Sequence, residues 1–328
     1  MKKLIAAIAL LLVPASVLAH HGGVTLAFGP GSPIETGSPM SLPEGSFVAG
    51  IRTEQVAWQK VNNPEDKSFF TFFNANLSYG FTPALTGTLI LPYYIKRTDG
   101  IGENKGPADM KFQFTYGFHY DQGSGFARNS TSDLAVSMDA GKGRTWLALS
   151  ATTSIPTGNH NKALDDGSVD PGMQTGFGAP AYTLSLAAAR ALGPITINSE
   201  LSADFFTARN DGPVGFQFGS EIRGNLAGVY ELYGNTNSDY LSEVDGILEL
   251  NYLHLDRDKE DGAGQEATGG NILYLSPGVR FSIPALQNAN LGLLVKVPIW
   301  KELNEQSQQQ GAEGLEKYRI ISTLSFYF

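Results

Sequence analysis

The sequence predicts an all-β protein, a transmembrane antiparallel up-and-down β-barrel of about twelve strands. Three observations lead to this fold class. Polar and apolar residues alternate along many segments, a secretory signal opens the chain, and the last strand ends in an aromatic residue. The mean hydropathy of -0.12 is low for a membrane protein. A barrel produces this value because its inward polar residues cancel its outward apolar ones.

The last strand is predicted over residues 317–328 and has two different faces, since successive strand side chains point to opposite sides. One face carries Tyr318, Ile320, Ser322, Leu324, Phe326 and Phe328, and the other carries Lys317, Arg319, Ile321, Thr323, Ser325 and Tyr327. Chain ends usually fray, so an aromatic terminus suits a lipid-facing strand better than a soluble one. The ending resembles the assembly signal of outer-membrane barrels. We therefore expect Phe326 and Phe328 to engage the barrel-assembly machinery.

The N-terminus predicts export. Lys2 and Lys3 precede an apolar run over residues 4–13, and Val17-Leu18-Ala19 fits a cleavage site, so residues 1–19 are predicted to be a signal peptide. No later stretch reaches the roughly twenty apolar residues of a membrane helix. Residues 20–45 are rich in Gly and Pro and are expected to form a periplasmic segment that folds back into the barrel mouth. The barrel is expected over residues 46–328.

Twelve segments alternate with the period of a strand. They are 46–61, 73–79, 85–96, 109–119, 145–155, 181–192, 195–205, 216–226, 243–252, 271–283, 290–300 and 317–328. An even strand number suits a barrel with both termini in the periplasm. The acidic connections at 61–67, 97–107, 156–176, 207–214, 257–269 and 302–316 are then expected to face outward, and residues 121–143 have no predicted place.

Composition excludes several function classes. The chain has 23 Lys and Arg against 32 Asp and Glu, and removing Lys2 and Lys3 would move the net charge from -9 to -11. An acidic chain of this kind argues against a nucleic-acid partner. The chain has no Cys, which excludes disulfides, thiolate metal sites and Cys nucleophiles. No cofactor motif is recognised, so no cofactor is expected.

The polar strand faces are expected to line the lumen. The residues predicted to form a constriction are Arg52, Asp109, Lys111, Glu200, Glu221, Arg223, Asp245, Glu249, Arg280, Lys296 and Arg319. Charges of both signs in a narrow lumen are expected to pair, because an unpaired buried charge is costly. Two interpretations remain open: a pore that selects small solutes by size and charge, and a packed polar plug that stabilises the barrel.

The sequence also contains residues that suit two other kinds of site. After cleavage the chain would begin with His20 and His21, and an amine beside two imidazoles suits copper or nickel, although a flexible polar terminus explains the pair as well. A lipase would need a Ser-His pair. His254 is the best-placed His, but the chain has no G-x-S-x-G nucleophile elbow. No enzyme activity is therefore expected.

Several motifs resemble an outer-membrane transporter family that is often labelled "MetA-pathway of phenol degradation". They are Gly106-Pro-Ala-Asp109-Met110, Ser154-Ile-Pro-Thr-Gly158, Tyr274-Leu-Ser-Pro-Gly278, Lys296-Val-Pro298 and the end from Tyr318 to Phe328. The resemblance spans residues 46–328, although Pro107-Ala108 replaces a glycine-rich turn and the acidic loops are long. It implies a porin-like barrel among the lipids of the bacterial outer membrane that transports small molecules without catalytic residues.

We therefore expect a channel for passive movement of small solutes, with apolar or aromatic compounds favoured. The alternatives are a metal-linked outer-membrane protein that uses His20, His21 and the acidic loops, and a closed structural barrel.

Overall fold

The computed structural model describes residues 24–25, 29–30 and 33–328, except 59–68, 100–101, 135–142, 166, 168, 210–214, 236, 239, 267, 287–288 and 305–315. The predicted signal peptide and the His20–His21 pair lie outside the described residues. Among the described residues, no helix is long and apolar enough to cross a membrane.

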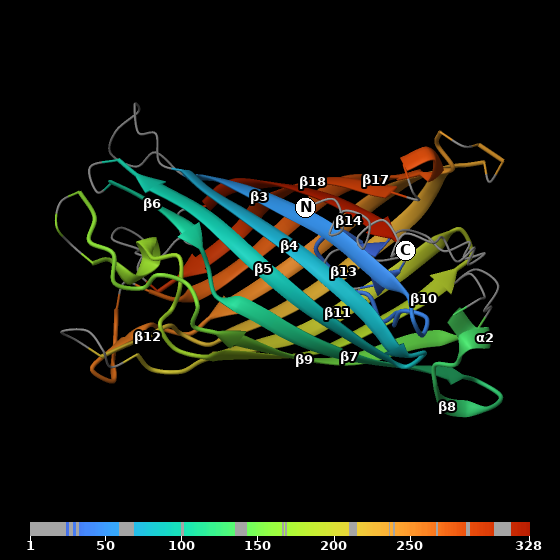
Figure 1. Ribbon diagram of the computed structural model, residues 1–328, viewed down its shortest axis with the longest axis horizontal. Helices are drawn as coiled ribbons and strands as arrows, with labels where there is room; N and C mark the ends of the chain where they lie inside the picture. The colour runs from blue at the N-terminus through green and yellow to red at the C-terminus, as the bar shows by residue number, and fades with distance from the viewer. Residues whose placement is uncertain are drawn as a thin grey trace, which may run out of the picture.

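Twelve antiparallel strands form one closed wall, with tilted strands that run around it in chain order (Figure 1). The wall consists of β3 (Phe47–Trp58), β4 (Phe69–Thr82), β5 (Leu85–Thr98), β7 (Met110–Asp121), β9 (Thr145–Ile155), β10 (Ala181–Leu192), β11 (Ile195–Phe206), β13 (Glu221–Gly234), β14 (Glu243–Leu255), β17 (Gly270–Ile283), β18 (Ala289–Leu303) and β19 (Glu316–Tyr327). The predicted all-β barrel is thus confirmed.

The first and last wall strands close the barrel. β19 pairs with β3 from Tyr327↔Val48 to Glu316↔Trp58, with one bulge near its start. Beyond the strand end, Phe47 and Phe328 exchange two backbone hydrogen bonds, of 3.1 and 3.0 Å. The terminal residue is therefore part of the seam, and no strand edge is left unpaired along this part of the wall.

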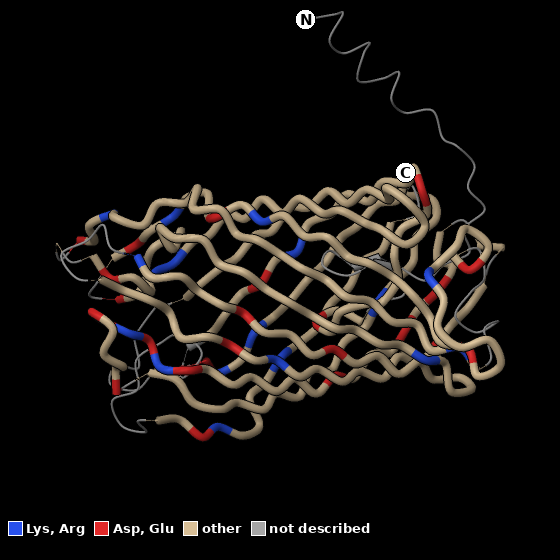
Figure 2. The backbone as a smooth tube through the Cα atoms, turned by 90° about the horizontal axis from the view of Figure 1, so that it is seen from below, with Lys and Arg blue, Asp and Glu red and all other residues tan. Residues whose placement is uncertain are grey.

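The predicted alternation holds along the wall. On β7, Phe114 is 53% exposed on the outer face, while its neighbour Thr115 is 8% exposed and points inward. The apolar outer face suits lipid, and the polar inner face suits a lumen. The described Lys, Arg, Asp and Glu residues lie at both ends of the barrel and also along the wall between them (Figure 2).

Short elements occupy several stretches that were expected to be loops. They are β1 (Val24–Thr25), β2 (Gly29–Pro30), β6 (Gly102–Pro107), β8 (Gly125–Arg128), β12 (Phe216–Gln217), β15 (Lys259–Glu260), β16 (Ala263–Gly264), α2 (Thr131–Leu134), and the 3-10 turns η2 (Pro171–Met173) and η3 (Pro284–Leu286). β6 extends the tip of β5 as a hairpin, and β12 joins β15 and β16 in a small separate sheet.

Two predicted boundaries were wrong. The strand expected over 216–226 begins only at Glu221, because Phe216 and Gln217 pair with β15 instead. Glu316 was expected in a loop but opens β19, where its side chain is fully buried.

The two ends of the barrel differ. At the end where Phe47 meets Phe328, several strands are joined by tight turns, such as those between β4 and β5 and between β10 and β11. At the other end the connections are longer. Outer-membrane barrels have short periplasmic turns and longer outer loops, so we take the end with the tight turns as periplasmic. The described part of residues 121–143, for which the sequence predicted no place, lies at this end, where β8 and α2 project beyond the wall (Figure 1).

Candidate functional site

The described residues 33–42 lie inside the barrel, against the inner faces of several strands. Ile34 is 0% exposed and packs with Val229, Ile247, Leu294 and Ile321. These four apolar side chains point into the lumen from β13, β14, β18 and β19. The sequence predicted a segment that folds back into the barrel mouth, and these described residues lie deeper, against the middle of the wall. We call residues 33–42 the inserted segment.

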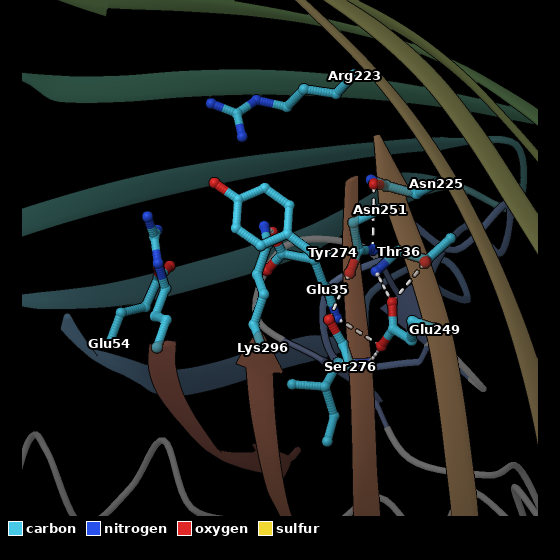
Figure 3. A network of polar contacts seen from close by, with 12 residues as sticks. Glu35, Thr36, Glu54, Arg223, Asn225, Glu249, Asn251, Tyr274, Ser276 and Lys296 are labelled. Atoms are coloured by element: carbon cyan, nitrogen blue, oxygen red, sulfur yellow. Dashed lines mark hydrogen bonds and ion pairs between the residues drawn. The ribbon is translucent and has the colours of Figure 1, made fainter. Parts of the chain in front are cut away.

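Glu249 anchors the tip of the inserted segment from the middle of β14. Its Oε1 accepts hydrogen bonds from the backbone N–H groups of Ile34 and Glu35, each at 2.9 Å. Its Oε2 accepts from the backbone N–H and the hydroxyl of Thr36, at 2.7 and 2.5 Å. Figure 3 shows Thr36 directly beside this carboxylate. Four donors around one buried carboxylate explain how a chain without regular structure is held in the lumen.

Further contacts hold the segment along its length. Glu200 accepts from the backbone N–H of Gly37 at 2.9 Å and from Asn225 at 3.0 Å. A Cβ at Gly37 would lie 2.7 Å from the Glu200 carboxylate, so glycine permits this close approach. Nearer the periplasmic end, the N–H of Leu42 donates to Thr86 at 2.8 Å.

Glu35 joins the inserted segment to two cations on the wall. Its carboxylate pairs with Arg52 and lies 2.6 Å from the Nζ of Lys296. Arg52 also donates to the carbonyl oxygen of Ile34 at 2.7 Å. The Lys296 ammonium lies 4.5 Å from the centre of the Tyr274 ring, which adds a cation–π contact.

The charge network continues toward the outer end. Arg319 bridges Glu54 at 2.6 Å and Glu316 at 2.9 Å, and Arg52 reaches Glu54 at 2.8 Å. Three cations therefore face three carboxylates in one connected set: Arg52, Lys296 and Arg319 with Glu35, Glu54 and Glu316. Such pairing lowers the cost of placing charges in a narrow lumen.

A loop enters the lumen from the outer end. Leu164 and Met173 of this loop pack against Val56 of β3 and Phe70 of β4, with Phe72 of β4 beside them. Val56, Phe70 and Phe72 point inward from the wall. Lys96 donates to the carbonyl oxygens of Gly172 and Gln174, at 2.8 and 2.7 Å. We call the described part of residues 156–180 the outer insert.

Asp109 holds the outer insert at its two ends. Its Oδ1 accepts from the N–H of Gly158 at 2.8 Å, and its Oδ2 accepts from the N–H of Phe177 at 2.7 Å. Phe177 then packs edge-on against Phe206 and Phe218, and Phe218 packs against Phe216. The outer mouth thus carries a cluster of four phenyl rings.

The described part of the connection between β7 and β9 contacts the inserted segment near the periplasmic end. Asn129 donates to the Ser41 hydroxyl at 3.0 Å. Arg144 pairs with Asp121 at 3.0 Å and with Asp133 at 2.6 Å. Burial raises the pKa of the Asp133 carboxyl, but hydrogen bonds from Ser130 and Arg144 outweigh it and hold the pKa below its ordinary value.

The predicted lumen residues all belong to the inner side of the wall, but they make different contacts from those expected. Only Arg280–Asp245 and Arg223–Glu221 pair with each other as proposed. Asp109, Glu200 and Glu249 bind backbone amides of the two inserts instead of cations. Lys111 makes no ion pair with a described residue.

Sequence reasoning missed Glu35 and Glu316, the partners of the central cations. Glu35 lies in a Gly- and Pro-rich segment, and Glu316 follows a long polar stretch, so neither stands in an alternating pattern. The apolar inward residues, such as Ile321 and Val56, were also missed. Alternation identifies a face but not the segment that packs on it.

The closed wall, lipid-suited outer face and charged interior define a transmembrane β-barrel of the bacterial outer membrane. No family model matches the chain, and no curated protein has a similar sequence. Among solved structures, the COG4313 outer membrane channel from Pseudomonas putida F1 aligns with 90% of this chain and 100% of its own, with a TM-score of 0.64 and 14% identity. This likeness concerns the fold, and it agrees with the porin-like barrel implied by the motif resemblance.

Two more distant barrels also align. The translocator domain of the autotransporter NalP from Neisseria meningitidis has a TM-score of 0.40 and 11% identity over 88% of this chain and 90% of its own. The beta domain of the Bordetella autotransporter BrkA has a TM-score of 0.43 and 9% identity over 88% of this chain and 100% of its own.

Proposed function

We propose that the protein is an outer-membrane channel for the passive movement of small solutes. The observation that supports this most is the connected charge network in the lumen, where the side chains of Arg319, Glu54 and Arg52 keep 17, 13 and 11% of their surface exposed. Solvent therefore touches these groups inside the barrel. Mobile solutes that pass them would be selected by charge and hydrogen bonding.

The two inserts argue for small solutes. The inserted segment reaches the middle of the wall from the periplasmic end, and the outer insert packs on inward side chains at the other end. A wide aqueous channel is typical of barrels of 16–18 strands. A barrel of twelve strands with two inserts leaves less room. Arg52, Lys296 and Arg319 would then form the constriction with their carboxylate partners.

Apolar or aromatic solutes are the favoured cargo. Phe177, Phe206, Phe216 and Phe218 gather at the outer mouth, and Phe70, Phe72 and Tyr94 lie on the inner wall below. The ammonium of Lys96 lies 5.5 Å from the centre of the Phe70 ring. Phenyl rings provide stacking surfaces for aromatic molecules, and the neighbouring cation suits an aromatic acid.

Conductance in planar bilayers tests the channel. We expect wild-type protein to give steady openings, and Lys296→Glu to shift the ion preference toward cations. Lys317→Glu is the matched control, because Lys317 is an exposed cation on the same end of the wall. Benzoate added on one side should reduce the current at a lower concentration than acetate. Equal blockage by the two acids would reject the aromatic preference.

A closed structural barrel is the second candidate. The complete burial of Glu249 and Thr36 at the middle of the wall, and of Glu316 nearer the outer end, favours it, because solvent does not reach these groups. It predicts no openings at any voltage in the wild type and no openings after removal of residues 33–42. The metal hypothesis rests on His20, His21 and the acidic loops. Copper titration of the mature protein against His20→Ala/His21→Ala tests it, and equal affinity of the two would reject it.

A further inference from the structure

The outer surface of the periplasmic rim carries two arginines on an otherwise apolar and aromatic face. Arg190 lies on β10 and Arg128 on β8, and both are exposed. Neither makes an ion pair with a described residue. Arg52, Arg280 and Arg319, on other strands of the wall, instead point inward to carboxylates. An unpaired arginine toward lipid needs an anionic partner.

The strand register shows that Arg190 points outward. It stands opposite Ile197, and along β10 it follows the outward-facing Tyr182, Leu184 and Leu186, with Leu192 beyond it. It therefore lies at the periplasmic edge of the apolar band, and two residue pairs separate it from the turn to β11. A long arginine side chain at this level can extend to the headgroup region while its stem stays on the apolar wall.

The same register places Arg128 near Arg190. Ala189, which precedes Arg190 on β10, pairs with Trp146 on β9, and Trp146 pairs with His119 on β7. The neighbouring residues face outward: Thr145 on β9 pairs with Tyr120 on β7, and Tyr120 pairs with Phe126 on β8. Arg128 pairs with Phe118, two residues further along β8. Three strand spacings of about 4.8 Å separate β10 from β8, so the two arginines lie on the order of 15 Å apart.

Aromatic rings fill the space beside the arginines. The Phe126 ring is 72% exposed and lies 4.9 Å from the ring of Tyr120 and 6.3 Å from that of Phe118. Because Tyr120 and Phe118 belong to the outer face of β7, Phe126 also faces outward. Aromatic residues at this level are typical of the membrane interface. β8 itself projects beyond the wall at the periplasmic end (Figure 1).

We propose that Arg128, Arg190, Tyr120 and Phe126 form a binding site for an anionic phospholipid of the periplasmic leaflet. The guanidinium groups bind the phosphate of the headgroup, and the rings contact the glycerol and upper acyl region. Charge complementarity selects this occupant, since the site offers two cations and no described carboxylate on its outer face. The site is separate from the lumen, so it does not depend on the channel proposal.

Native mass spectrometry of the full-length barrel in detergent tests the site, with phosphatidylglycerol and phosphatidylcholine as separate probes. We expect the wild type to retain phosphatidylglycerol preferentially, and each arginine removed in Arg128→Gln and Arg190→Gln to reduce that preference about fivefold. The conservative pair Arg128→Lys/Arg190→Lys should keep most of it. Lys317→Gln, at the opposite rim, should have no effect.

Folding is checked by the heat-dependent shift in gel migration that barrels show. Arg128 lies outside the closed wall. Arg128→Gln therefore still tests the site if Arg190→Gln does not fold. An unchanged preference in Arg128→Gln and Arg190→Gln would overturn the proposal. A preference for phosphatidylglycerol that only Lys317→Gln removes would also overturn it, because the phosphate would then be bound at the opposite rim.

Discussion

Thr36 donates both its backbone N–H and its hydroxyl to one oxygen of Glu249, at 2.7 and 2.5 Å, although the two residues lie 213 positions apart in the sequence. This contact joins the inserted segment to the middle of the barrel wall. Glu249 accepts more hydrogen bonds from the inserted segment than any other described side chain of the wall, and the first prediction follows from this.

Glu249→Ala should release the inserted segment. The substitution leaves four buried donors without an acceptor, and each lost partner costs about 1–3 kcal/mol. We expect faster amide exchange at residues 34–37 and larger conductance steps. Glu44→Gln, an exposed carboxylate that follows the segment, is the control and should change neither. Unchanged exchange in Glu249→Ala would show that other contacts hold the segment.

Glu35 and Lys296 should be energetically coupled. Both side chains are nearly buried, and breaking one partner of a buried pair costs about 3–5 kcal/mol. Glu35→Gln and Lys296→Gln should each lower the free energy of unfolding in urea, and the double variant should lose less than the sum. Strict additivity of the two losses would mean that the pair makes no net contribution.

Asp109→Asn should detach the outer insert, because Gly158 and Phe177 lose a charged acceptor. We expect new protease cleavage within residues 156–180 while the barrel stays folded. Glu266→Gln, on another exposed loop, is the matched control. If Asp109→Asn resisted protease as well as the wild type does, the packing of Leu164 and Met173 alone would hold the outer insert in place.

Removing Phe328 should impair insertion and leave export intact. Phe328 exchanges two backbone hydrogen bonds with Phe47 at the barrel seam and exposes its ring on the outer face. We expect lower outer-membrane levels with accumulation in the periplasm, whereas Phe328→Trp should insert normally. Normal levels of the deletion variant would count against a role of the terminal aromatic in assembly.

The periplasmic connection should loosen in acid. The pKa of Asp133 is lower in the folded protein than the ordinary value of about 3.9, so its contribution to stability is complete above that pH and is lost as pH falls through the folded pKa. Arg144 contacts both Asp133 and the Trp146 ring. Trp146 fluorescence in a Trp58→Phe/Trp300→Phe background should change at low pH, and Asp133→Asn should abolish this transition. Persistence of the transition in Asp133→Asn would assign it to another group.

Residue alternation was enough to predict the barrel, because the same rule acts at each strand: Phe114 meets lipid and Thr115 meets the lumen. The aromatic end predicted the closing strand. The inside of the barrel was less predictable. Glu249 acts as an anchor because residues 34–36 lie beside it. Their position results from packing between segments far apart in the chain, which the sequence pattern does not give.

The same reason explains the pairing errors. Lys296 was expected to pair with a carboxylate on another strand, but Glu35 reaches it from the inserted segment. A period of two gives the direction of a side chain and its strand but not its depth or its partner. Gly37 carries a weak signal, since a glycine permits the close approach to Glu200, but that signal is readable only once the barrel is known.

The most direct measurement is single-channel conductance of the purified full-length protein, with Lys296→Glu and Lys317→Glu measured under the same conditions. We predict steady openings in all three proteins and a shift of ion preference toward cations in Lys296→Glu alone. If neither the wild type nor Lys296→Glu opened at any voltage, the result would contradict the channel and favour a closed barrel.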